Sequence, residues 1–243
     1  MRIPRIYVAA PLSPGADIVL DERAANHVVK VLRMRAEAPL ILFNGAGGEY
    51  RAVLLACAKH QVLVRVIEHL PREVESPLAL TLAQSVCKGE KMDYTLQKAV
   101  ELGVRRIAPV VSERTVVNLS GDRLQKRQAH WTGVIRHACE QCGRNTLPEL
   151  MPLVSFSDFV ATSATGLCLL LYHRSDTGLR QLQCQDAAIT LLVGPEGGWS
   201  ESELELAQRH QFHPVVFGPR VMRTETAAVA AISAIQCLWG DLG

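Results

Sequence analysis

Short apolar runs separated by turn residues make up much of the first part of the chain. Each run is bounded by turn residues such as Asn44-Gly45 and Lys59-His60, as in strands joined by tight turns. Asp21 precedes a helical pattern that contains Ala25 and Val28, so one capped helix interrupts the strands. These features predict a small barrel-like module over residues 1–72, with strands at 18–20, 40–43, 49–56 and 61–67.

From residue 78 onward, apolar strands alternate with helical patterns. Residues 71–77 are charged and bounded by prolines, so we place a domain boundary there. Alternating strands and helices predict a mainly parallel sheet with helices on both faces, in a second domain at 73–243. The predicted strands are 78–83, 107–111 and 167–172, and the predicted helices are 88–103 and 124–143.

Two further strands, 187–193 and 212–217, each end in a Gly-Pro loop that leads into a helix. The first loop is Gly194-Pro195-Glu196-Gly197-Gly198, and Ser200 with Glu203 then has the spacing of a capping box. The second loop is Gly218-Pro219-Arg220-Val221-Met222-Arg223, and a helix at 224–239 follows. An isolated loop of this kind is often only a turn. Two of them at the carboxyl ends of strands predict one ligand pocket with two walls.

The composition excludes several classes of protein. The 243 residues are 48% hydrophobic, enough for a full core, and no run approaches the roughly 18 apolar residues of a membrane helix. The N-terminus lacks the apolar core of a signal peptide, so we expect a soluble, cytoplasmic protein. Seven scattered cysteines fit reduced thiols. Cys139 and Cys142 have metal-site spacing but no second pair, so we expect no metal.

The net charge of +2 is unevenly distributed along the chain. Residues 1–72 hold ten Lys or Arg against six Asp or Glu, 88–144 hold eleven against six, and 145–243 hold five against ten. A basic front part suits a polyanionic partner, although solvated surface charge explains it equally well.

Several motifs, in their order along the chain, resemble the ribosomal RNA small subunit methyltransferase E family. The resemblance covers nearly the whole chain. It rests on Arg2-Ile3-Pro4-Arg5-Ile6-Tyr7, Lys88-Gly89-Glu90-Lys91-Met92-Asp93, Gln97-Lys98, Glu101-Leu102-Gly103, Glu140-Gln141-Cys142-Gly143-Arg144, the first glycine loop, and 218–227.

The resemblance implies an α/β fold: a SPOUT-type, trefoil-knotted methyltransferase domain at 73–243, preceded by a small PUA-like β-barrel domain that binds RNA at 1–72. It also implies a homodimer that uses S-adenosylmethionine to methylate N3 of a uridine in small-subunit (16S) ribosomal RNA, free or in the 30S subunit. On its composition alone, the alanine-rich helix at 224–239 is either a core helix or a subunit interface, and the resemblance favours the dimer interface. The cofactor residues implied are Leu171, Tyr172, His173, Val193, Gly194, Pro195, Glu196, Gly197, Gly198, Phe217, Gly218, Arg220, Val221, Met222 and Thr224.

Catalysis requires a base for the weakly acidic N3–H group of uridine. We hypothesise that Glu196 or Glu225 takes this proton and that Arg223 stabilises charge on the uracil oxygens. Glu225 has an equal claim to a structural role at a helix N-terminus. Candidates for RNA binding are Arg2, Arg5, Arg33, Lys88, Lys91, Arg114 and Arg144, with Arg144 the strongest.

Two other functions remain open at this point. The same fold could methylate a ribose 2′-hydroxyl, or the chain could be a non-catalytic ribosome assembly factor whose glycine loops are only structural.

Overall fold

The structure, a computed structural model, describes residues 3–58, 61–117, 119–162 and 166–243. Its internal contacts divide the chain into two compact units, Met1–Glu75 with Arg136–Leu147, and Ser76–Ile135 with Pro148–Gly243. From the sequence we predicted one domain boundary, between residues 72 and 73. The inclusion of residues 136–147 in the first unit was not predicted. The predicted turn at Lys59-His60 lies outside the described residues.

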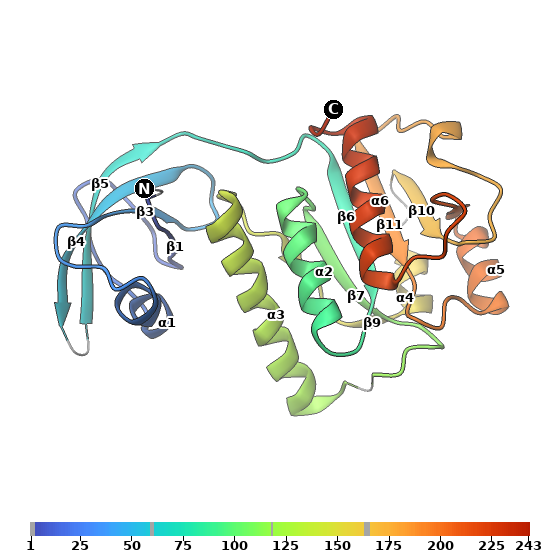
Figure 1. Ribbon diagram of the computed structural model, residues 1–243, viewed down its shortest axis with the longest axis horizontal. Coiled ribbons are helices and arrows are strands. Elements are labelled where there is room, and N and C mark those ends of the chain that lie inside the picture. Colours follow the sequence, from blue (N-terminus) through green and yellow to red (C-terminus); the bar gives the residue numbers. More distant parts are fainter. Residues whose placement is uncertain (1–2, 59–60, 118, 163–165) are drawn as a thin grey trace. The chain divides into compact units, whose positions relative to one another are not determined.

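The first unit contains one five-stranded sheet with strand order β1-β3-β4-β5-β2. β1 pairs parallel to β3, and the other neighbours are antiparallel. The carboxylate of Asp21 accepts a hydrogen bond from the Ala24 amide at 2.7 Å, which confirms the predicted cap. The elements are β1 (Arg5–Tyr7), β2 (Asp17–Val19), α1 (Glu22–Asn26), a π-helical turn (His27–Val31), β3 (Pro39–Phe43), β4 (Glu49–Ala58) and β5 (Gln61–Leu70) (Figure 1).

Alternation along these strands builds the core of the first unit. Leu40 and Leu42 of β3 point to the same face as Val62, Val64 and Val66 of β5, and all are almost completely buried. Ala24 and Val28 from the helical segment pack onto this cluster. The predicted strands at 18–20, 40–43, 49–56 and 61–67 are therefore confirmed, each with a shift of a few residues at its ends.

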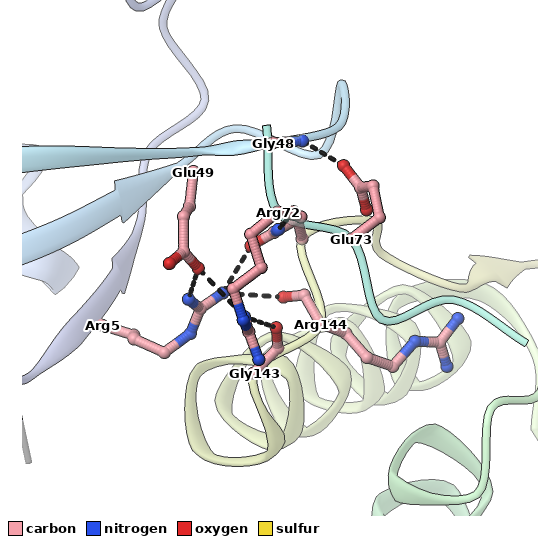
Figure 2. A network of polar contacts seen from close by, with 8 residues as sticks. Arg5, Gly48, Glu49, Arg72, Glu73, Gly143 and Arg144 are labelled. Carbon is pink, nitrogen blue, oxygen red and sulfur yellow. Dashed lines mark hydrogen bonds and ion pairs between the residues drawn. The ribbon is translucent and has the colours of Figure 1, made fainter. Parts of the chain in front are cut away.

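The C-terminal end of α3 (Gly121–Cys142) and the segment after it complete the first unit. The Tyr7 amide donates to Glu140 Oε1 at 3.0 Å, and Arg5 Nη2 donates to Asn145 Oδ1 at 2.6 Å. Arg5 also pairs with Glu49 and donates to the Arg144 carbonyl oxygen, as Figure 2 shows. Polar side chains thus link β1 to a segment more than 130 residues further along the chain.

The second unit contains a parallel sheet with strand order β12-β10-β11-β6-β7-β8, and β9 also pairs with β7. This confirms the predicted parallel sheet. Its strands are β6 (Ala79–Ser85), β7 (Arg106–Val111), β8 (Glu149–Leu150), β9 (Val154–Ser155), β10 (Leu167–Leu171), β11 (Ala188–Val193) and β12 (His213–Val215).

Helices cover both faces of this sheet. Leu191 and Leu192 point to opposite faces of β11, yet both are fully buried. One face packs against Phe156, Phe159 and Ala207, which come from α4 (Phe156–Thr162) and α5 (Glu201–Arg209). On the same unit, α2 (Glu90–Glu101) packs against α6 (Thr224–Trp239), which contacts β11 (Figure 1). No helix among the described residues combines the length and hydrophobicity needed to span a bilayer.

The local signals for helix ends are largely confirmed. Ser200 and Glu203 form the predicted reciprocal capping box of α5. Gly103, with φ of 81°, follows the end of α2 as expected of a helix stop. Sequence patterns missed β1, β8, β9 and α4, which are all short. The trefoil knot stays a prediction.

Candidate active site

A cavity of about 530 Å³ opens at the carboxyl ends of β10, β11 and β12. Three segments line it: 171–173 after β10, 193–199 after β11, and 215–224 between β12 and α6. Every residue predicted to bind the cofactor lies in its wall. Lys91, Trp199, Val215, Val216, Arg223 and Ala227 complete the lining.

The pairing of the strands brings the three segments together. Leu170 of β10 is in register with Leu192 of β11, and Leu171 with Val215 of β12. Since all three strands are parallel, their carboxyl ends meet at one edge of the sheet. The cavity is therefore a direct result of strand order, as the two Gly-Pro loops predicted.

Trp199 fixes the first glycine loop to β10. Its indole N–H donates to the Leu171 carbonyl oxygen at 2.9 Å, and its ring packs against Phe156 with centroids 5.1 Å apart. A Cβ atom on Gly194 would lie 3.1 Å from this ring, so the glycine permits the close approach. Sequence reasoning missed Trp199, because one aromatic residue after two glycines gives no periodic signal.

Thr224, the first residue of α6, links the end of the second loop to the first loop. Its hydroxyl donates to the Gly194 carbonyl oxygen at 2.6 Å and accepts a hydrogen bond from Gln84 Nε2 at 3.0 Å. Gln84 is fully buried at the end of β6. Burial raises the pKa of the neighbouring Cys87 thiol to about 11, so this group stays protonated near neutral pH.

Two basic residues hold the first glycine loop by hydrogen bonds. Lys91 Nζ donates to Glu196 Oε1 at 2.8 Å, and Arg114 Nη1 donates to the Gly197 carbonyl oxygen at 2.8 Å. Burial favours the protonated form of Glu196, but the hydrogen bond and charge of Lys91 hold the pKa of its carboxyl below the usual range. Both cations were predicted to bind RNA, and the structure places them against the protein's own loop.

The three predicted catalytic residues are not equivalent. Glu196 and Arg223 line the cavity, whereas Glu225, in the first turn of α6, does not. Glu225 Oε2 is buried, and it has no hydrogen-bond partner within the part of the chain that the structure describes. The described residues also hold no group of three His, Cys, Asp or Glu arranged to bind a metal ion.

Family models match both parts of the chain. Residues 74–236 match a model described as an RNA methyltransferase domain, and residues 20–67 match an RNA methyltransferase PUA domain. The chain is 34% identical to the ribosomal RNA small subunit methyltransferase E of Buchnera aphidicola, over 99% of this chain and 98% of the relative.

The chain belongs to the ribosomal RNA small subunit methyltransferase E family. A solved family member from Neisseria gonorrhoeae, bound to S-adenosylmethionine, is 39% identical with a TM-score of 0.93, and each chain covers 100% of the other. A methyltransferase from Legionella pneumophila in complex with bound S-adenosylmethionine is 41% identical with a TM-score of 0.98, also over 100% of both chains. The predicted family is confirmed, and so is the order of a PUA-like domain followed by an RNA methyltransferase domain.

Two family motifs that suggested RNA contact have a structural role here. Arg144 is 3% exposed, and its Nε donates to Glu75 Oε2 at 3.0 Å. Arg5 is 8% exposed and pairs with Glu49, as Figure 2 shows. Both guanidinium groups are therefore taken up by ion pairs within the first unit. RNA binding by Arg5 and Arg144 stays a prediction. Arg33 and Lys88 are exposed, and Arg2 lies outside the described residues.

Proposed function

We propose that this member of the family transfers a methyl group from S-adenosylmethionine to N3 of a uridine in small-subunit ribosomal RNA. The cavity carries the proposal, because its three walls are the segments expected to hold the cofactor. The two S-adenosylmethionine-bound relatives, which match this chain over its full length, support the same cofactor here.

The residues of the cavity fit this cofactor. A volume of about 530 Å³ lies within the usual range for small-molecule sites. Gly198 and Gly218 have positive φ, and a Cβ atom on either would meet no other atom, so the backbone there faces open space. Backbone groups of Gly218, Val221 and Met222 can match the donors and acceptors of an adenine ring. The bound cofactor supplies a methyl group already activated by its sulfonium.

The charged residues of the site then accept the N3 proton of the uridine and stabilise the negative charge that develops on its base. Uridine N3 is a better nucleophile after it loses its proton, and Glu196 or Glu225 accepts that proton. Arg223, which lines the cavity just before α6, stabilises negative charge on the uracil oxygens. N3 lies on the pairing edge of the base, so the uridine reacts unpaired or extruded.

We also propose an RNA-binding role for the first domain and a dimer interface on α6. The domain at 1–72 binds RNA, and exposed Arg33 and Lys88 contact its phosphates. Two copies associate through α6, on which Ala227, Ala230 and Ala234 are only partly buried. The seven cysteines are all free thiols, which suits work in the reducing cytoplasm.

Mass spectrometry of the reaction product tests the proposal. The purified protein is incubated with labelled S-adenosylmethionine and small ribosomal subunits that lack the modification, and the methylated nucleoside is identified. N3-methyluridine is the expected product. A 2′-O-methyl nucleoside would refute the acceptor, and RNA binding without any product would favour an assembly factor.

Substitution of the two carboxylates tests the proton transfer. Glu196→Gln and Glu225→Gln are compared with wild type in single-turnover methyl transfer. The variant that removes the base should react at least about 100-fold more slowly. Unchanged rates in both would rule out a carboxylate base.

A further inference from the structure

The ion pair between Lys91 and Glu196 joins a rigid helix to a glycine-rich loop at the wall of the cavity. We infer that Lys91 is a positioning residue for methyl transfer, whose ammonium holds the Glu196 carboxylate ionised and directed at the cavity. The inference rests on the proposed function, because it gives Glu196 the role of proton acceptor. It also replaces the predicted role of Lys91 in RNA binding.

The packing of α2 restrains the backbone position of Lys91. Lys91 is the second residue of α2, and the next residue, Met92, is almost fully buried together with Leu96. The helix also packs along α6, so the backbone of Lys91 has little freedom. Glu196 stands 105 residues later on a loop, and both side chains line the cavity. The ion pair with Lys91, which is carried by this packed helix, therefore directs the Glu196 carboxylate.

The backbone of the loop is held by other groups. The Gly198 amide donates to the Pro195 carbonyl oxygen at 2.9 Å, which closes a tight turn. Arg114 donates to the Gly197 carbonyl oxygen, and a Cβ atom on Gly197 would lie 3.1 Å from Arg114 Cβ. Arg114 thus acts on the main chain of the loop, whereas Lys91 acts on the side chain of Glu196. This division provides a matched control for experiments.

The charged groups around Glu196 influence whether its carboxyl group is ionised. Glu225, from the first turn of α6, acts electrostatically on the same Lys91 and on Cys87, so a second carboxylate is nearby. Arg223 lines the cavity, and Arg114 contacts the adjoining residue of the loop. Backbone hydrogen bonds from Glu196 and Lys88 also lower the pKa of the Glu196 carboxyl. Without Lys91, the effect of burial would be opposed less strongly, and a protonated Glu196 cannot accept a proton.

Proton transfer from uridine to Glu196 moves a negative charge from the carboxylate to the uracil ring, and the total charge of the site stays the same. The N3–H bond of uridine breaks, an O–H bond forms on Glu196, and the negative charge passes to the uracil ring. Glu196 is then neutral, so the Lys91 ammonium faces the uracil anion and Glu225. Lys91 therefore has a carboxylate to pair with before the transfer and an anion to stabilise after it.

Titration of the Glu196 carboxyl tests the inference without turnover. Glutamate carboxyl carbons are labelled with ¹³C, and the Glu196 signal is identified by its loss in Glu196→Gln. Lys91→Met should raise the midpoint of this titration, and Lys91→Arg should keep it near the wild-type value. Arg114→Met should leave the midpoint unchanged but weaken S-adenosylmethionine binding in calorimetry.

Single-turnover methyl transfer between pH 5 and 9 supplies the second readout. The acidic limb of the rate should move upward in Lys91→Met and stay in place in Lys91→Arg and Arg114→Met. An unmoved Glu196 titration in Lys91→Met would overturn the inference, even if cofactor affinity fell as in Arg114→Met, because Lys91 would then only support the loop. If wild type gives no methylated product, the proposed function fails, whereas the carboxyl titration still decides whether Lys91 controls Glu196.

Discussion

Replacement of Arg5 by Met should destabilise the first unit strongly. The Arg5 and Glu49 side chains are only 6% and 9% exposed. Met fills much of the same space, but it leaves the Glu49 carboxylate without its buried partner. It also removes the donor to Asn145 Oδ1. The hydrogen bond from Arg5 to the Arg144 carbonyl oxygen, drawn in Figure 2, is lost as well.

The size of the effect follows from what remains around Glu49. Loss of one partner from a buried ion pair costs about 3–5 kcal/mol. Arg72 Nη1 still lies 3.1 Å from Glu49 Oε2, but its side chain is 46% exposed, so its compensation is partial. We therefore expect a loss of about 3 kcal/mol, the low end of that range and a large part of a typical stability.

Native-state hydrogen exchange measures this loss separately in each unit. A loss of about 3 kcal/mol should make the slowest amides of β3 and β4 exchange about 100-fold faster, with little change in β6 and β11. Arg51→Met is the matched control, because Arg51 and Glu68 form an ion pair whose side chains are 54% and 45% exposed. Such surface pairs contribute about 0–1 kcal/mol. If β3 and β4 in Arg5→Met exchanged as slowly as in the control, the stabilising role of the buried pair would be refuted.

Three further predictions follow from the same structure. Thr224→Val removes the hydroxyl between Gln84 and the Gly194 carbonyl oxygen, so it should cost about 1–3 kcal/mol in thermal or urea unfolding and weaken S-adenosylmethionine binding in calorimetry. Ser200→Ala removes the capping box of α5 and should cost about 1 kcal/mol, seen as a melting temperature about 2–4 °C lower. Burial, assisted by the charges of His137 and Arg23 and opposed by that of Glu140, holds the pKa of His27 below its usual range. The unfolded chain then binds more protons, so the first unit should lose stability as pH falls below about 6.5, and urea unfolding of His27→Gln should lack this loss.

The fold was predictable wherever a local pattern was long or carried its own end signals. The apolar run at 187–193 became β11, and Ser200 with Glu203 marked the start of α5 to the residue. The alanine-rich helix at 224–239 matched α6 at both ends. These signals lie within a few residues of one another, so a single chain displays them without any tertiary information.

The rest of the site depends on contacts that no local pattern encodes. Lys91 and Glu196 are 105 residues apart, and a basic residue in an amphipathic helix looks the same whether it contacts RNA or a loop. The ion pair of Arg144 was not predictable for the same reason, because its partner, Glu75, lies 69 residues earlier. The family resemblance located the motifs, but a motif can be required for stability as easily as for binding.

The first unit is built from two separate segments of the chain, and these segments are synthesised at different times. Strands β1 to β5 emerge from the ribosome well before residues 136–147, which supply Glu140, Asn145 and the Arg144 carbonyl oxygen to β1. Until then, Arg5 and the Tyr7 amide lack these partners. The N-terminal strands therefore cannot reach their final stability as soon as they are made, and they must await a helix encoded much later. A fragment ending at Glu75 should accordingly fold less stably than the same strands in the full chain.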